Sequence, residues 1–309
     1  MALIGPAVTF AAAGPWVAQL HPVSLVAAAA LIACYVALAR GESRPSRRQR
    51  WAFAAAVAAL VVTESWPLED LAAHWSLTAL VVQRLLLVLV VAPMLLLSIP
   101  SPLAARLTRP RLIDGALAFV SRPPVAVIVF TAIAVGTLLT PSVAAQSSSS
   151  GARAATDALL LVSGLVLWSP VVTTLPGASR PSPLGRAVYL FVQSVVPGFP
   201  SIVFIFSHHP LYPAFEHVHE AFGFSPLVDQ QLAGLVAKVA TLPVLWSVAW
   251  VSLSKGHLAD REGLDTEPLT WAEVQRQLER AERAERSGLR RESSGTPGTG
   301  PTAQPPPTA

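Results

Sequence analysis

The chain has 309 residues, of which 52% are hydrophobic and 13% are charged, and its formal net charge is +4. This charged fraction is about half the usual value, which excludes an ordinary soluble globular domain. The single cysteine, Cys34, excludes an intramolecular disulfide and a zinc site built from paired thiolates. The composition therefore indicates a membrane protein.

Apolar stretches that approach or exceed the length of a membrane-crossing helix recur along the chain. We read seven of them, in chain order: 17–39, 51–66, 77–99, 124–140, 158–175, 187–206 and 232–253. The second and the fourth are shorter than the roughly 20 residues that a straight span needs. The sequence thus predicts an all-α, polytopic membrane protein with seven transmembrane helices in residues 1–255.

Residues 256–309 differ in composition from the rest and are predicted to form a tail. Its segment from about 270 to 291 has the pattern of an amphipathic helix, because Thr270 and Glu273 match a capping box and glutamates precede arginines at i,i+4. The last residues, SSGTPGTGPTAQPPPTA, are rich in Pro, Gly and Thr, which predicts disorder.

Basic residues are distributed very unevenly between the segments that separate the spans. Nineteen of the 22 Lys and Arg residues lie in 40–50, 104–123, 176–186 and the residues after Ser254, whereas the alternate segments contain only Arg153. Cytoplasmic loops are enriched in Lys and Arg, so this asymmetry predicts an outer N-terminus and a cytoplasmic C-terminus. The positive charge is explained by topology and by an anionic inner leaflet, and we expect no nucleic-acid binding.

The segment SHHPLYPAFEHVHEAFGFSPLVDQQLAG, residues 207–234, concentrates titratable groups on the predicted outer side. Four of the seven histidines lie in it: His208, His209, His217 and His219. Copper and zinc both accept neutral imidazole, so any bound metal is expected to use these histidines.

A nearby glutamate, Glu216 or Glu220, would complete the metal's ligand shell. The alternative is that all these side chains are interfacial polar residues, since a loop between helices must be hydrophilic. Their spacing matches no zinc signature and does not decide between the two interpretations.

Two cations, Arg84 and Lys238, lie inside predicted spans, each about seven residues from the outer end. That places them roughly 10 Å deep, where a charge must find a partner or extend to the interface. Asp157 and Asp229 begin the fifth and the seventh span at the outer edge, so we expect them to be the partners, with Arg84 meeting Asp157. The alternative is that both cations extend to the interface.

The sequence carries no recognisable catalytic motif. It has no Gly-rich phosphate loop, no Gly-x-Ser-x-Gly and no His-Glu-x-x-His. We therefore expect a protein that is not an enzyme.

Three stretches resemble the CtaG family of cytochrome c oxidase assembly factors. PLYPAF and FSPLVDQQLAGLVAK, within 210–238, are similar to a signature in which Leu-Tyr-Pro precedes Asp-Gln-Gln-x-Ala-Gly at the start of the last helix. SWPLEDLAAHWSLTALVVQRLLLVLVVAPMLLL is similar to the family's second and third helices, and SGLVLWSPVV to its fifth. The resemblance covers about residues 15–255, and its most specific run contains Asp229 and Gln230.

The resemblance implies a seven-helix protein of the bacterial plasma membrane that helps to mature the copper-containing haem–copper oxidase. The implied partners are the lipid bilayer and cytochrome c oxidase subunits or other assembly factors. Copper is the implied metal, and the implied role is copper delivery or oxidase maturation at the outer face of the membrane. The alternatives are a copper-handling or transport protein and a metal-free membrane scaffold.

The chain departs from the family pattern where the family carries histidines. A His-x-x-Gln-His run in the third helix corresponds here to Leu80, Gln83 and Arg84. A His-x-x-Glu-His run before the Trp of the fifth helix begins at Arg153 and ends at Asp157. If those histidines bind copper or haem in the family, this chain has lost that site, and an ion pair between Arg84 and Asp157 would replace it.

Overall fold

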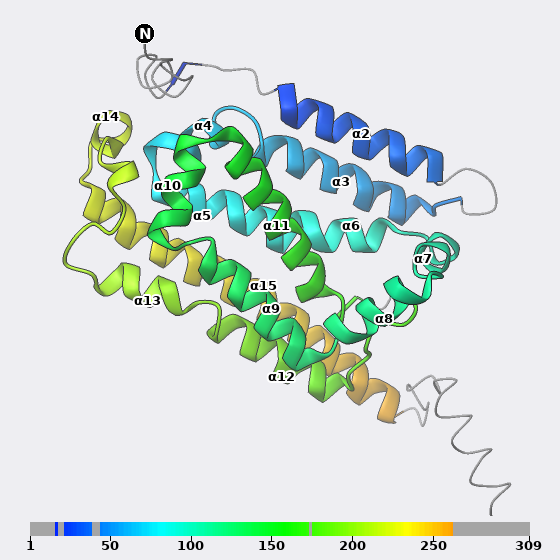
Figure 1. Ribbon diagram of the computed structural model, residues 1–309. Coiled ribbons are helices and arrows are strands. Elements are labelled where there is room, and N and C mark those ends of the chain that lie inside the picture. Colours follow the sequence, from blue (N-terminus) through cyan, green and yellow to red (C-terminus); the bar gives the residue numbers. More distant parts are fainter. Residues whose placement is uncertain (1–15, 18–21, 39–43, 173–174, 262–309) are drawn as a thin grey trace, which may run out of the picture. The chain divides into compact units, whose positions relative to one another are not determined.

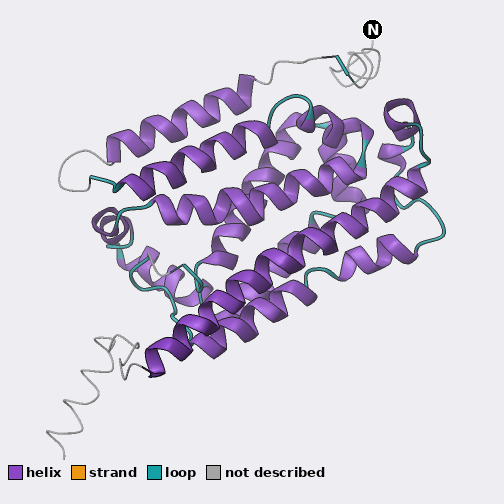
Figure 2. Ribbon diagram, turned by 180° about the vertical axis from the view of Figure 1, so that it is seen from behind, coloured by secondary structure: helices purple, strands orange, loops and turns teal. Residues whose placement is uncertain are grey.

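The computed structural model describes residues 16–17, 22–38, 44–172 and 175–261. The chain divides into two compact units, residues 1–257 and 258–309. The helix predicted over about 270–291 and the Pro/Gly/Thr-rich end lie outside the described residues. The described residues of the first unit form helices and no strand (Figures 1 and 2).

Each of the seven predicted spans contains one helix or several consecutive ones. The described elements up to Ser98 are α2 (Pro22–Leu38), α3 (Arg47–Thr63), α4 (Leu68–Asp70), the π-helix η1 (Leu71–Trp75), α5 (Leu77–Leu86), the π-helix η2 (Leu87–Val91) and α6 (Ala92–Ser98). They are followed by α7 (Ser101–Leu107), α8 (Arg111–Val120), α9 (Pro123–Gly136), α10 (Thr140–Ser148) and α11 (Ser150–Trp168). The last elements are α12 (Pro183–Val195), α13 (Phe199–Phe206), the 3-10 helix η3 (Pro213–Phe215), α14 (Val218–Phe222) and α15 (Pro226–Arg261). Of these, α4, η1, α7, α8, η3 and α14 lie between the predicted spans.

Four helical segments of the described chain are long and apolar enough to cross a membrane alone: 77–98, 150–168, 183–206 and 226–256. Two bent pairs, 47–63 with 68–75 and 111–120 with 123–136, raise the number to six if each pair is one broken span. The apolar helix 24–38 is shorter. The all-α class of the described residues, and the presence of helices that are long and apolar enough to cross a membrane, are thus confirmed. Seven spans and the orientation of the termini stay predictions.

The centre of the first unit is formed by α11 packed against α9, η2 and α6, with α3 on the other side of η2 and α6 (Figure 1). Gly164 makes this packing possible, because a Cβ there would lie 2.9 Å from the Ala92 Cβ and 3.2 Å from the Val88 Cα. Trp168, at the end of α11, donates its indole N–H to the Val88 carbonyl over 2.8 Å. Small residues of this kind let transmembrane helices approach closely.

The long helix α15 runs beside α12 and α13 (Figure 2). Gly234 lies so close to α13 that a Cβ would meet the Ser201 carbonyl at 2.7 Å. Nearer the other end, the Trp246 indole donates to Ser194 Oγ over 3.2 Å. The α12–α13 pair is interrupted at Pro197–Gly198, as the prolines of the sixth predicted span suggest.

Candidate functional site

The polar residues of interest lie at one end of the first unit, which we call the loop end (Figure 1). This end is formed by α4, η1, the α9–α10 turn, η3 and α14. It comprises residues 64–76, 137–153 and 207–229. The helix η3 packs against both η1 and α10, so the 207–225 loop lies on the bundle.

The loop is fixed to the bundle by Tyr212 and Gln230. The Tyr212 hydroxyl donates to the Leu138 carbonyl over 2.6 Å, and burial raises the pKa of Tyr212 to about 12, which keeps the hydroxyl protonated. Gln230 Oε1 accepts from the Leu211 amide over 2.7 Å, while its Nε2 donates to the His209 carbonyl over 3.4 Å. The Leu-Tyr-Pro and Asp-Gln-Gln stretches of the sequence therefore act together as an anchor.

Asp229 is fully buried and caps α5. Its carboxylate accepts from the Leu77 amide over 2.6 Å, from the Thr78 amide over 3.3 Å and from Ser76 Oγ over 2.8 Å. A negative charge at a helix N-terminus is favourable because it meets the unpaired amides and the positive end of the helix dipole. This explains why Asp229 does not serve as the partner of a lysine.

The predicted pairing of Lys238 with Asp229 is wrong. Among the described residues no carboxylate oxygen lies within 4 Å of the Lys238 nitrogen. Lys238 instead extends toward Gly198, where the α12–α13 interruption leaves space, and lines a cavity of about 110 Å³ together with Arg84.

The predicted ion pair between Arg84 and Asp157 is also wrong. Arg84 is 7% exposed, and its Nη1 donates to Thr137 Oγ1 over 3.1 Å. Its Nη2 donates to the Thr137 carbonyl and to Gln146 Oε1, each over 2.9 Å. Thr137 is the C-cap of α9, so the guanidinium lies at the negative end of a helix dipole and satisfies a carbonyl there.

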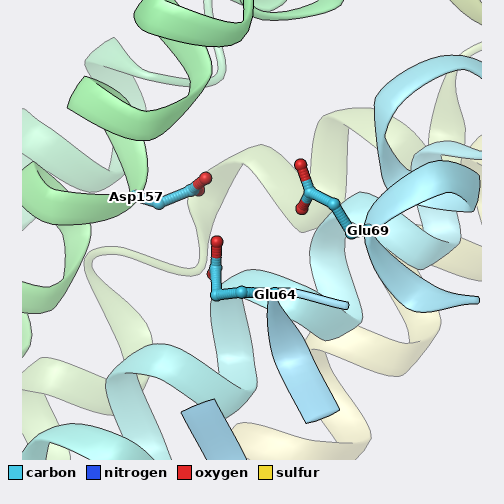
Figure 3. A group of neighbouring side chains, drawn as sticks. All are labelled: Glu64, Glu69 and Asp157. Atoms are coloured by element: carbon cyan, nitrogen blue, oxygen red, sulfur yellow. The ribbon is translucent and has the colours of Figure 1, made fainter. Parts of the chain in front are cut away.

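A group of three carboxylates lies beside this network (Figure 3). Glu64 follows the last residue of α3, Glu69 lies in α4 and Asp157 lies in α11, and one oxygen of each lies within 4.8 Å of the other two. The bend of 51° between α3 and α4 turns the two glutamates toward α11.

Arg153 and Gln83 hold the central carboxylate of this group. Arg153 Nε donates to Glu69 Oε1 over 2.7 Å, and Gln83 Nε2 donates to Glu69 Oε2. The Gln83 amide also donates to the Thr63 carbonyl over 3.3 Å. These contacts join α3, α4, α5 and α11.

Several oxygens of this group are buried without a hydrogen-bond partner. They are Glu64 Oε1, Asp157 Oδ2 and Gln83 Oε1. Buried polar groups are normally paired, and buried carboxylates normally have counterions. Carboxylate and amide oxygens are ligands for hard cations, so the arrangement can hold such an ion or share protons.

The four predicted metal-ligating histidines are all exposed: His208, His209, His217 and His219. His217 Nδ1 lies 3.1 Å from Glu220 Oε1, and His219 Nδ1 lies 3.1 Å from the Glu216 carbonyl. In the described part of the chain, the one group of three converging acidic or histidine ligands is the carboxylate group, and the loop histidines form none. The loop metal site stays a prediction.

Sequence reasoning missed Glu64, Glu69, Gln83 and Arg153 as members of a common site. The signal that could have found them is charge: Arg153 is the single basic residue in the predicted outer segments, while Glu64, Glu69 and Asp70 lie within seven residues of each other in one of those segments.

The described chain is thus a helical protein with four to six segments that are apolar and long enough to cross a membrane. The chain belongs to the Caa3_CtaG family, described as cytochrome c oxidase caa3 assembly factors, whose family model matches residues 29–255. This confirms the resemblance to the CtaG family, and the family's role suggests a function without catalysis. No curated protein and no solved structure matches the chain.

Proposed function

We propose that the chain promotes maturation of cytochrome c oxidase from the outer face of the bacterial plasma membrane, and that the loop end is its working surface. One observation carries this proposal: in a chain of the assembly-factor family, Tyr212 and Gln230 fasten an exposed, histidine-bearing loop to the bundle. Oxidase subunits or other assembly factors are the partners of this surface.

The fastening has a consequence for binding. A loop that is already ordered loses little conformational entropy when a partner docks on it, so more of the contact energy is available for affinity. Tyr212 and Gln230 bond to backbone groups of the bundle and of the loop, so they hold the loop's position and leave its outward side chains free to contact a partner.

Copper delivery is the finer part of the proposal. Exposed imidazoles are suited to a cargo ion that must be accepted and released, because the ion stays accessible to an incoming ligand. Ligation needs neutral imidazole, so copper binding is expected to weaken as the pH falls.

A metal-free scaffold is the second candidate. It is favoured by the observation that the loop histidines, as described, do not converge as a group of three ligands. In that case the same loop would contact oxidase subunits directly.

The experiment uses a host strain that lacks the chain, complemented with the wild type, with a variant in which His208, His209, His217 and His219 are all changed to alanine, or with His257→Ala as a control outside the loop. The copper and haem content of the purified oxidase is measured by mass spectrometry and absorbance. The expected result is an oxidase that is depleted of copper with the quadruple variant and normal with the control.

Normal copper with the quadruple variant, but a defective oxidase without the chain, would establish the scaffold function in place of copper delivery. A normal oxidase in the strain without the chain would contradict both candidates.

A further inference from the structure

The carboxylate group at the loop end carries more negative charge than its neighbours neutralise. Of the two arginines nearby, Arg153 pairs with Glu69 at 2.7 Å, while Arg84 is directed to Thr137 and Gln146. Glu64 and Asp157 are left without an ion pair among the described residues.

We propose that Glu64, Glu69 and Asp157 form a binding site for one hard divalent cation of the Ca²⁺, Mg²⁺ or Mn²⁺ type. This site differs from the loop histidines in place and in ligand chemistry, and it does not depend on the proposed function.

The positions of the three carboxylates suit a shared ion. Their closest oxygens lie within 4.8 Å of one another, so a central point lies about 2.8 Å or less from all three. Oxygen ligands bind Ca²⁺ at roughly 2.3–2.6 Å, which small side-chain rotations would reach. The three oxygens come from α11, from α4 and from the end of α3, so one ion would bridge three separate segments.

The charge also suits a divalent ion. With all three carboxylates ionised, the one guanidinium that pairs with them leaves an excess of two negative charges in a largely buried site, where Asp157 is 8% and Glu69 9% exposed. Unpaired charges are strongly unfavourable in such surroundings, and a bound cation removes the excess without adding a protein side chain.

Asp157 gives a further indication of a ligand. It is 8% exposed, its Oδ2 is buried without a hydrogen-bond partner, and its carboxylate points toward Glu64 and Glu69 (Figure 3). Buried acceptors are normally paired with a donor, and a cation would satisfy this one.

The ligand set selects the class of ion. It contains neither thiolate nor imidazole, and three carboxylates suit Mg²⁺, Ca²⁺ and Mn²⁺ better than Cu⁺. A bound ion would hold α3, α4 and α11 together beneath the loop.

The test is Mn²⁺ binding to the purified full-length chain in detergent after treatment with a chelator. Free Mn²⁺ gives a six-line electron paramagnetic resonance signal that is lost on binding. The expected result is saturable binding of one ion per chain, displaced by Ca²⁺ or Mg²⁺, together with a rise in Tm on adding the ion. The E64Q/D157N variant should bind at least about 10-fold more weakly, whereas the E216Q/E220Q control, which changes two exposed loop carboxylates, should bind like the wild type.

The single variant Glu64→Gln controls for misfolding of the double variant, because Glu64 is only half-buried and glutamine has nearly the same shape. Its affinity should also fall while its circular dichroism spectrum stays that of the wild type. The proposal is overturned by absent or non-saturable Mn²⁺ binding to the folded wild type, or by equal affinity in wild type and Glu64→Gln. The quadruple histidine variant should keep full Mn²⁺ binding, so failure of copper delivery and failure of this site are distinguishable.

Discussion

Arg153 Nε donates a 2.7 Å hydrogen bond to Glu69 Oε1 and so joins α11 to α4, two helices whose paired residues are 84 positions apart in sequence. The two side chains are 7% and 12% exposed, so they form a buried ion pair. Removing one partner of such a pair leaves an uncompensated charge, which here would add to the two neighbouring carboxylates. Arg153→Leu is therefore expected to lower the free energy of unfolding by about 3–5 kcal/mol.

The measurement is unfolding of the purified chain in detergent, followed by far-ultraviolet circular dichroism with and without a chelator. Arg109→Leu, at an exposed position, is the matched control and should change stability by no more than about 0.5 kcal/mol. Equal losses in the two variants would contradict the role given to the ion pair.

The cap of α5 gives a second prediction. Asp229→Ala leaves the Leu77 and Thr78 amides and the Ser76 hydroxyl without their acceptor, and the expected loss of stability is about 2–4 kcal/mol. Asp229→Asn should lose less, because an amide oxygen still accepts. Hydrogen exchange should become faster at the first amides of α5 in both variants, whereas Asp114→Ala, which removes an exposed carboxylate from α8, should leave them unchanged.

The contacts of Arg84 give a third prediction. A double-mutant cycle between Arg84→Leu and Gln146→Leu should show a coupling energy between about 0.5 and 3 kcal/mol, because the two side chains are joined over 2.9 Å. The cycle between Arg84→Leu and Asp157→Leu should show a smaller coupling, since no ion pair joins them within 4 Å. A larger coupling energy for Arg84 with Asp157 than for Arg84 with Gln146 would instead support the ion pair that the sequence suggested.

Tyr212 gives a prediction about pH. Burial raises its pKa from 10.0 to about 12 in the folded chain, so between those values the unfolded chain loses its phenolic proton while the folded chain keeps it. The contribution of Tyr212 is therefore fully present below pH 10 and is lost as the pH rises from 10 toward 12, by roughly 2 kcal/mol in total. Tyr212→Phe should be less stable than the wild type at pH 8, and its stability should fall less steeply above pH 10. Parallel stability curves for the two chains would show that this tyrosine is not buried in solution.

Hydropathy predicted the helical class and located the apolar segments because the bilayer imposes one length and one polarity on every span. It did not predict side-chain partners, because these depend on where each helix ends and how it is rotated. Arg84 illustrates this. The predicted span continued to residue 140, whereas α9 ends at its C-cap Thr137. The carbonyl of Thr137 accepts the hydrogen bond from the Arg84 guanidinium.

The carboxylate group was hidden from the sequence for a similar reason. Glu64 and Glu69 are turned together by the bend between α3 and α4, and Asp157 lies nearly 90 residues further along the chain. Neither the bend nor the rotation of α11 follows from apolar periodicity in helices that are hydrophobic on most sides. By contrast, the Asp-Gln-Gln run drew attention to Asp229 and Gln230, which the structure places in buried contacts with α5 and with the loop, although the sequence did not predict those contacts.

The cap that Asp229 places on α5 also has a consequence for biosynthesis. Asp229 is made 152 residues after Leu77, whose amide it accepts, which at roughly 5–20 residues per second is a delay of roughly 8–30 s. Until then Ser76 can cap α5 from within its own segment, but the Leu77 and Thr78 amides lack the carboxylate that accepts from them in the finished fold. The first turn of α5 therefore reaches its final hydrogen bonding only when the last helix is in place.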